Sequence, residues 1–273
     1  MKITSLNVNQ FFGLGSRKDY PSKDPEKKEK KWIELKERII KIINESLEKD
    51  DDILLLQEIP YKMYPEASNS VKVSKVYFDL QKTCEDERIN IYKTNSNCDV
   101  FKTIALSKEK YEYAVDEEIV KEAFRLKKYE DCRLVVLKKD LALNNEELYI
   151  VGIHNFSEHY LSIVFLHNLE KFINCHFKNK NVIVCGDINI YADAILNKIE
   201  QKFLHETNLC DAWINKGYNN DDEKGFTYKK SRIDKFFINK DKIRSYEIKV
   251  GKEIDEKVSD HNSISLIINS MKG

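Results

Sequence analysis

Short apolar runs rich in β-branched residues recur along the chain, and each has the length and composition of a β-strand. They are separated mostly by clusters of Asn, Asp and Lys, since the chain holds only 8 Gly and 4 Pro. The pattern predicts strands at residues 3–8, 53–56, 76–80, 104–106, 134–137, 148–153, 182–185, 233–238 and 264–268.

Two longer segments keep the helical period instead. Their apolar residues recur at three- and four-residue spacing between Lys and Glu, which is typical of a helix with one buried face. A weaker pattern of the same kind predicts a third helix over residues 194–203. The periodic residues are Trp32, Leu35, Ile39, Ile42, Ile43 and Leu47 in the first segment, and Leu161, Phe165, Leu169, Phe172, Ile173 and Phe177 in the second.

Many short strands with a few long helices indicate an α/β (α+β) protein, in which sheets pack together and are covered by helices. No internal repeat, low-complexity tract or linker divides the 273 residues, a length ample for a substantial core. We therefore expect a single domain over residues 1–273. The aperiodic segment 10–24 is predicted to be a long loop beside the end of the first strand.

Composition narrows the class of protein. With 46 basic and 46 acidic side chains, the net charge is zero, so any affinity for a polyanion must be local. The 11% aromatic content argues against disorder, and no run approaches the ~20 apolar residues of a membrane helix. The six cysteines form no close pair and the start shows no apolar signal segment, so we expect free thiols in the cytoplasm.

Polar residues follow four of the predicted strands. The first strand ends in Asn7-Val8-Asn9, the second in Gln57-Glu58, a later one in His154, and another in Gly186-Asp187-Ile188-Asn189. Taken singly, each has an ordinary interpretation: a solvated strand edge for Glu58, an Asx turn for Asp187 and Asn189, a structural histidine for His154. If the strand ends converge, they build a pocket of oxygen donors with one imidazole.

Two further segments extend this set. Thr227-Tyr228 leads into Arg232-Ile233-Asp234, and Ser259-Asp260-His261 precedes the last predicted strand. In combination and in this order, these residues resemble the endonuclease/exonuclease/phosphatase superfamily, the family of deoxyribonuclease I, exonuclease III, sphingomyelinases and inositol polyphosphate 5-phosphatases. The resemblance spans residues 7–261, nearly the whole chain.

The resemblance implies a four-layer sandwich, with two mostly antiparallel β-sheets face to face and helices on both outer sides. It also implies metal-assisted hydrolysis of a phosphate ester by in-line attack of water. Glu58, Asn9 and Asp260 would hold the metal, which is expected to be Mg²⁺, with Mn²⁺ as a substitute. Carboxylate and amide oxygens suit Mg²⁺, whereas the cysteines lack the spacing of zinc ligands.

The resemblance also assigns roles around the phosphate. Asp187 would orient or deprotonate the attacking water, and Asn189 would donate to a phosphate oxygen. His261 would contact the scissile phosphate, with Asp234 fixing its tautomer. His154 would supply a donor, or a proton to the leaving oxygen, and Asn7 and Asn9 would hold the ligands and phosphate in place.

The substrate is less closely defined. A histidine at position 154 disfavours the abasic-site repair branch of the family, which usually places a tyrosine there. Arg17 and Lys230 are candidate contacts to a nucleic-acid backbone, although scattered surface charges explain them almost as well. We expect a nuclease or nucleic-acid phosphodiesterase, without membrane association or an obligate protein partner. The alternatives are an enzyme acting on a small or lipid-linked phosphate, such as an inositol phosphate or sphingomyelin, and an inactive binding protein on the same fold.

Overall fold

The structure is a computed structural model, and it describes residues 1–9, 25–63, 72–73, 75–94, 101–113, 119–120, 133–141, 146–191, 193–251 and 258–271. Two six-stranded sheets form its centre. The predicted loop 10–24 and Arg17 within it lie outside the described residues. A short pair of strands, β3 (Lys62–Met63) and β4 (Lys72–Val73), stands apart from the two sheets.

The first sheet has the order β13-β14-β1-β2-β6-β5. Its β1 and β2 run parallel, and its other neighbours are antiparallel. The parallel pair matters for function, because the carboxyl ends of β1 and β2 reach the same edge. The strands are β1 (Lys2–Asn7), β2 (Ile53–Pro60), β5 (Asn90–Tyr92), β6 (Phe101–Ser107), β13 (Ile243–Val250) and β14 (Ile264–Met271).

The second sheet has the order β11-β12-β10-β9-β8-β7 and repeats this arrangement. Again one pair, β9 with β10, is parallel and the remaining neighbours are antiparallel. The strands are β7 (Glu112–Tyr113), β8 (Leu134–Leu141), β9 (Glu146–His154), β10 (Asn181–Asp187), β11 (Cys210–Asp211) and β12 (Asp234–Ile238).

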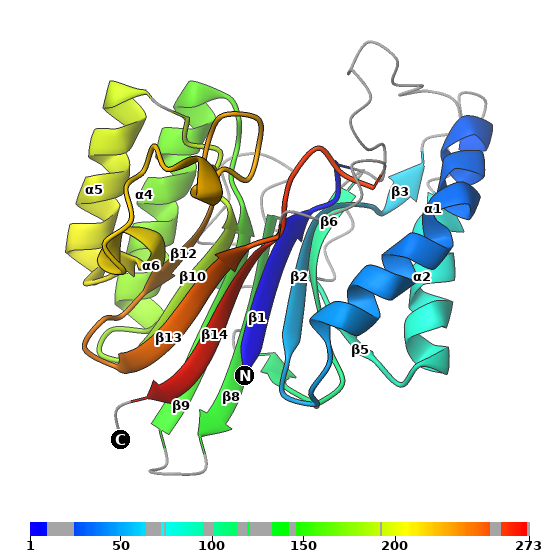
Figure 1. The fold of residues 1–273 in the computed structure, drawn as a ribbon, viewed down its shortest axis with the longest axis horizontal. Helices are drawn as coiled ribbons and strands as arrows, with labels where there is room; N and C mark the ends of the chain where they lie inside the picture. Colours follow the sequence, from blue (N-terminus) through cyan, green and yellow to red (C-terminus); the bar gives the residue numbers. More distant parts are fainter. Residues whose placement is uncertain are drawn as a thin grey trace.

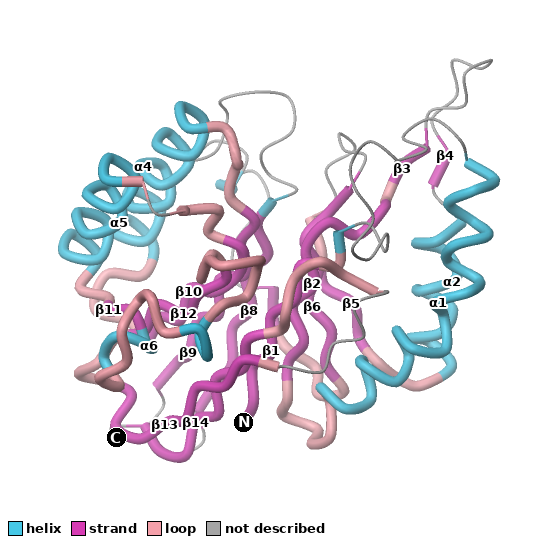
Figure 2. The backbone as a smooth tube through the Cα atoms, turned by 45° about the horizontal axis from the view of Figure 1, so that its top comes forward, coloured by secondary structure: helices cyan, strands magenta, loops and turns pink. Residues whose placement is uncertain are grey.

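Helices cover the outer face of each sheet. The helices α1 (Pro25–Ser46) and α2 (Lys75–Asp86) lie on one side of the molecule, and α4 (His159–His176) and α5 (Ala194–Thr207) lie on the other, with the strands between them (Figures 1 and 2). The short helix α6 (Ala212–Asn215) and the 3-10 turn η4 (Glu223–Gly225) follow β11. The predicted four-layer sandwich is confirmed.

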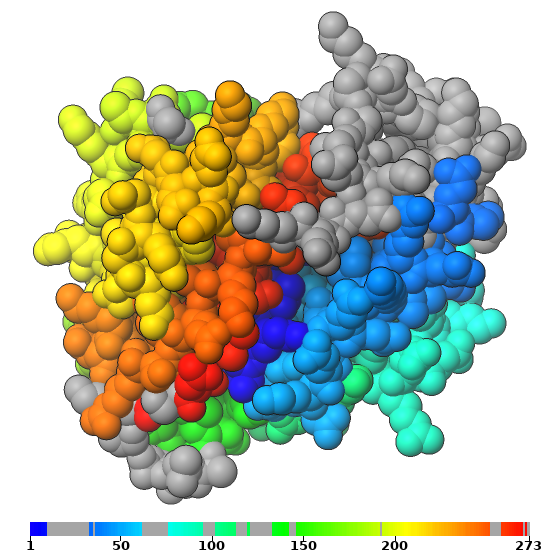
Figure 3. All heavy atoms as spheres, in the orientation of Figure 1, coloured from blue at the N-terminus to red at the C-terminus, as the bar shows by residue number. Residues whose placement is uncertain are grey.

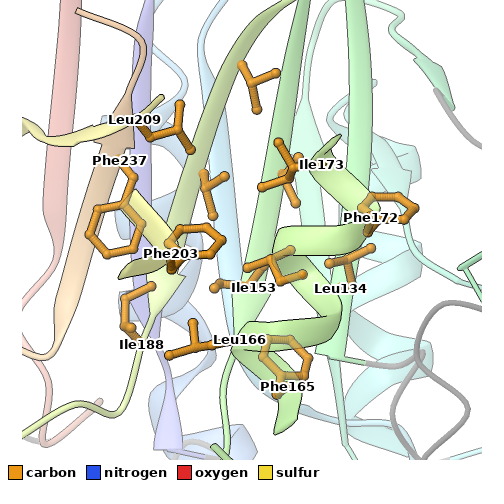
Figure 4. Close-up of a cluster of buried hydrophobic side chains, with 14 of the residues drawn as sticks. Leu134, Ile153, Phe165, Leu166, Phe172, Ile173, Ile188, Phe203, Leu209 and Phe237 are labelled. Carbon is orange, nitrogen blue, oxygen red and sulfur yellow. The ribbon is translucent and has the colours of Figure 1, made fainter. Parts of the chain in front are cut away.

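Three apolar clusters hold the layers together. One lies between the sheets and joins side chains such as Leu55 of β2 to Ile150 of β9. A second packs α1 and α2 on the first sheet, and a third packs α4 and α5 on the second, where Phe165, Phe203 and Phe237 are fully or almost fully buried (Figure 4). The alternation of side chains along each strand supplies both faces, which explains the continuous apolar runs in the sequence.

One predicted strand is wrong. Residues 76–80 belong to α2, in which Val76, Tyr77, Leu80 and Cys84 are buried while Phe78 is 61% exposed. This spacing of buried residues is helical, but a five-residue apolar run is too short to distinguish a buried helix turn from a strand. The other predicted strands and the three predicted helices are found, with shifted ends.

The first and last strands of the chain lie side by side at the centre of the first sheet. Lys2 pairs with Ile267 and Ser5 with Ile264 in antiparallel register, and the blue and red atoms adjoin in Figure 3. This pairing brings the segment before β14 next to the end of β1. Among the helices described, none has both the length and the apolar character required to cross a membrane.

Candidate active site

The carboxyl ends of the two parallel strand pairs meet between the sheets. Asn7 lies in register with Gln57 in the first sheet, and Asp187 lies in register with His154 in the second. The Asn7 amide Nδ2 donates a hydrogen bond of 2.9 Å to Asp187 Oδ2, which joins the two sheets at this edge. Two polar residues 180 positions apart in the chain therefore share one site.

Glu58 reaches the same site through an irregularity in β2. The β2–β6 register shifts between Leu56 and Ile59, and Glu58 adopts a positive φ of 57°. A bulge of this kind redirects one side chain, and a non-glycine residue at positive φ stores strain that is common at functional sites. Glu58 Oε1 accepts from Asn7 Nδ2 at 3.2 Å and lies 3.5 Å from His154 Nε2.

A turn at the end of β10 fixes the position of Asp187, and this turn depends on the residues on either side, Gly186 and Asn189. Gly186 has φ 140°, and a Cβ there would lie 1.9 Å from the Ile153 carbonyl oxygen, so only glycine fits. After Asp187 the chain turns, and Asn189 N–H donates to Asp187 Oδ1 at 2.9 Å. Burial, together with the nearby carboxylates of Asp234 and Glu58, raises the pKa of Asp187 to about 7, although His261 and Asn7 oppose the shift.

Asp234 and His261 form a buried pair. His261 Nδ1 lies 2.9 Å from Asp234 Oδ2, and Thr227 Oγ1 accepts from the Asp234 backbone N–H at 3.0 Å. Burial alone would disfavour the imidazolium, but the charge and hydrogen bond of Asp234, with Asp187 and Asp260 nearby, raise the pKa of His261 to about 9. The ligand atoms of Asp187, Asp234 and His261 lie within 4.8 Å of one another.

Asp234 is available to His261 because the adjacent basic residues have other partners. Arg232 donates to Asp211 Oδ2 at 2.6 Å, and Lys235 donates to Glu200 Oε2 at 2.6 Å, with all four side chains buried. Arg232 presents almost no charge to solvent, since its side chain is only 2% exposed. The two ion pairs instead anchor the segment that carries Asp234.

His154 is oriented by an arginine that the sequence pattern did not single out. Arg133 Nη1 lies 3.3 Å from His154 Nδ1 and donates to the carbonyl oxygens of His154 and Asn155 at 3.2 Å each. A guanidinium can only donate, so Nδ1 accepts and Nε2 carries the proton toward Glu58 and Asp187. Burial, then the charges of Arg133 and His261, hold the pKa of His154 well below its usual value, so His154 is neutral.

The last motif is fastened to the first strand. Ser259 Oγ donates to the Asn7 carbonyl oxygen and accepts from the His261 backbone N–H at 3.0 Å. This contact spans 252 residues and sets His261 relative to the end of β1. Asp260 Oδ1 lies 3.9 Å from His261 Nε2, so it is at the edge of the same group.

Three further residues were predicted to belong to the site, namely Asn9, Asn189 and Lys230, and the structure gives each a different environment. Asn9 is buried beside the site, and its backbone N–H donates to Asn7 Oδ1 at 2.8 Å. The Asn189 side-chain amide, predicted to donate to a phosphate oxygen, donates to the Asn155 carbonyl oxygen at 2.9 Å. Lys230 is exposed at the tip of a tight turn before β12.

The carboxylates of the site fit a divalent cation. Glu58, Asp187 and Asp234 converge, so burial and the neighbouring carboxylates raise the pKa of Asp187, and the buried Asp234 Oδ1 has no hydrogen-bond partner among the described residues. A cation held by oxygen ligands would relieve this repulsion. Among the described residues, the close group of potential ligands is Asp187, Asp234 and His261, whereas the sequence suggested Glu58, Asn9 and Asp260. Glu58 links the two groups, because the Asn7 amide donates a hydrogen bond both to Glu58 and to Asp187.

No family model matches the sequence, and no curated protein gives a significant match. Solved structures do match. D. rerio TDP2 complexed with a single-strand DNA product superposes with a TM-score of 0.60 at 16% identity, covering 99% of both chains. An endonuclease/exonuclease/phosphatase family protein from Leptotrichia buccalis C-1013-b gives 0.59 at 16% identity, covering 99% of this chain and 100% of that one.

The endonuclease domain of TRAS1, a telomere-specific non-LTR retrotransposon, gives a TM-score of 0.56 at 14% identity, again covering 99% of both chains. At these identities the likeness concerns the fold. The protein has the fold of the endonuclease/exonuclease/phosphatase, or deoxyribonuclease I-like, superfamily, as the sequence motifs predict.

Proposed function

We propose that the protein is a metal-dependent phosphodiesterase that hydrolyses nucleic-acid phosphodiester bonds by in-line attack of water. The observation that carries this proposal is the position of Asp187. Its carboxylate is buried, Asn7 donates a hydrogen bond to its Oδ2, and the Asp234–His261 pair lies beside it. A buried carboxylate that is held in place beside a cationic donor suits proton removal from water at an anionic centre.

The residues divide the work as follows. Asp187 accepts the proton of the attacking water while Asn7 holds its Oδ2 in place. His261, kept protonated by Asp234, donates from Nε2 to a phosphate oxygen and stabilises the charge that develops there. His154, neutral with its proton on Nε2, supplies a second donor, 3.9 Å from Asp187 Oδ2. Asn189 joins them when its amide leaves the Asn155 carbonyl for the phosphate.

Glu58, with Asn9 and Asp260, would hold Mg²⁺ in this proposal. The metal ion would polarise the phosphate and neutralise the charge of the phosphate. Glu58 supports this role by its strained backbone, which aims a carboxylate at the site. Nucleic acid as the substrate is supported by the exposed Lys229 and Lys230 on the chain segment beside His261, and by the single-strand DNA held by D. rerio TDP2. The cytoplasmic location stays a prediction.

A substrate panel tests the proposal. Purified protein with Mg²⁺ is incubated with supercoiled plasmid, single-stranded DNA, RNA, inositol phosphates and sphingomyelin, with and without EDTA. We expect cleavage of a nucleic acid that EDTA abolishes and Mg²⁺ or Mn²⁺ restores. Asp187→Ala should reduce turnover by at least about 100-fold, while Asp241→Ala, which changes an exposed carboxylate in the turn between β12 and β13, should not.

Hydrolysis of inositol phosphates or sphingomyelin alone would overturn the nucleic-acid assignment and keep the site. Chelator-resistant hydrolysis would contradict the proposed metal dependence. A fully active Asp187→Ala protein would contradict the assignment of the active site itself.

A further inference from the structure

A tight hairpin turn lies directly before β12. Tyr228 N–H donates to the Ser231 carbonyl oxygen at 3.0 Å, and Ser231 N–H donates to the Tyr228 carbonyl oxygen at 2.9 Å. Lys229 turns the chain with a φ of 50°, and both Lys229 and Lys230 are exposed at the tip. The turn is therefore a fixed structure that presents two cations to solvent.

The base of this turn is attached to the proposed catalytic histidine. Tyr228 forms a β-bridge with His261, and the Asn262 N–H donates to the Thr227 carbonyl oxygen at 2.7 Å. The rings of Tyr228 and His261 lie 4.8 Å apart between centroids, with an interplanar angle of 38°. In Figure 1 the orange loop before β12 and the red loop before β14 accordingly approach each other at one end of the molecule.

A second tyrosine extends this contact away from the histidine. Tyr191 follows β10 four positions after Asp187, and its ring packs edge-on against Tyr228 at 6.3 Å and 76°. The His261 side chain is 8% exposed, whereas Tyr191 is 39% exposed. The three rings thus form a series that begins beside the scissile phosphate of the proposed reaction and ends at the surface. We call Tyr191, Tyr228 and Lys229 the aromatic step.

Burial does not explain the aromatic step. A tyrosine that only fills the core would be covered, yet Tyr191, the outermost of the three residues, is 39% exposed. Lys229 Nζ lies 4.7 Å from the Tyr228 ring centroid, so a cation accompanies the rings. Flat aromatic faces beside a cation are the arrangement by which proteins hold unpaired nucleotides, with the base stacked on a ring and its phosphate near the charge.

We propose that the aromatic step binds a nucleotide adjoining the scissile phosphate, with its base stacked against Tyr191, so that the enzyme selects single-stranded nucleic acid. This inference rests on the proposed function and adds the substrate class. In a duplex both faces of each base are covered by neighbouring bases, so an unpaired base alone can use the ring. A phosphate ester without a base, such as an inositol phosphate, gains nothing from Tyr191.

The test compares Tyr191→Ala with Tyr191→Phe on a single-stranded oligonucleotide and on the same sequence as a duplex. We expect Tyr191→Ala to raise KM for the single strand about tenfold, with kcat and the duplex KM changed less than about twofold. Tyr191→Phe should behave as the unmodified protein, because the ring and not the hydroxyl makes the contact. Phe78→Ala, which removes an exposed ring from α2 on the other side of the molecule, is the matched control.

Equal effects on single-stranded and duplex KM would overturn the single-strand assignment, and so would an unchanged single-strand KM. A loss of activity in Tyr191→Phe equal to that in Tyr191→Ala would also overturn the stacking role. If the unmodified protein hydrolyses no nucleic acid but cleaves inositol phosphates or sphingomyelin, the proposed function fails together with the inference. If it cleaves nucleic acid and Tyr191→Ala does so equally well, only the inference fails.

Discussion

Asn7 at the end of the first strand donates one hydrogen bond of 2.9 Å to Asp187 of the opposite sheet. The same Nδ2 lies 3.2 Å from Glu58 Oε1, so one amide group spaces the proposed base from the proposed metal ligand. Asn7 is 1% exposed, and its neutral side chain brings two carboxylates together without adding charge. The active-site geometry therefore depends on a residue that does no proton chemistry.

Asn7→Ala should lower kcat by about 100-fold, which is the usual cost of removing one preorganised donor from an active site. Asp187 would lose its fixed orientation, and the two carboxylates would repel each other more directly. Steady-state kinetics with Mg²⁺ measure the effect. Asn197→Ala on α5 is the control for an asparagine outside the site, and activity of Asn7→Ala within threefold of the control would contradict the role.

Asp234→Asn should lower the pKa of His261 from about 9. NMR titration of the His261 ring in metal-free protein measures this directly. A raised pKa stabilises the folded state fully below about pH 6.5, and that contribution is lost as the pH rises through about 9. The unmodified protein should therefore lose stability over this interval, by an amount on the order of 3 kcal/mol, and the variant should lose less. An unchanged His261 titration in Asp234→Asn would refute the pairing.

Arg133→Met should lower kcat about tenfold, since His154 would lose the donor that fixes its tautomer. KM should stay within about twofold, because Arg133 acts on His154 and not on the substrate. Arg133→Lys should restore part of kcat by supplying one donor. Arg244→Met, which removes an exposed arginine from β13, controls for the loss of an arginine. A rise in KM with unchanged kcat would instead assign Arg133 to substrate binding.

Gly186→Ala should destabilise the fold by about 3 kcal/mol or more, because the new Cβ would meet the Ile153 carbonyl oxygen 1.9 Å away at a φ of 140°. Gly217→Ala distinguishes the cost of backbone strain from the cost of the steric clash. Gly217 also has a positive φ, 87°, but no atom lies within 4 Å of its added Cβ, so it should cost only about 1 kcal/mol. Urea unfolding compares the two, and equal costs would show that backbone strain alone matters.

The neighbours of Asp234 show where sequence reasoning reached its limit. Arg232 lies two positions away and could have neutralised it, but the structure pairs Arg232 with Asp211, 21 residues earlier. Arg133 gave no signal either, because a single arginine before a strand is common and its contact with His154 spans 21 residues. Both contacts depend on how strands from distant segments are ordered within the second sheet.

The sequence by itself determined the apolar runs of the strands, the helical faces of α1, α4 and α5, and the polar residues that end β1, β2, β9 and β10, because alternation and period are local properties. It predicted a strand at residues 76–80, which is wrong, since a short apolar run suits a strand and a helix equally. Only the tertiary structure decided that these strand ends face each other across two sheets, and that Arg133, Tyr191 and Tyr228 adjoin them. Such contacts join residues far apart in the chain, and the packing of the layers sets them.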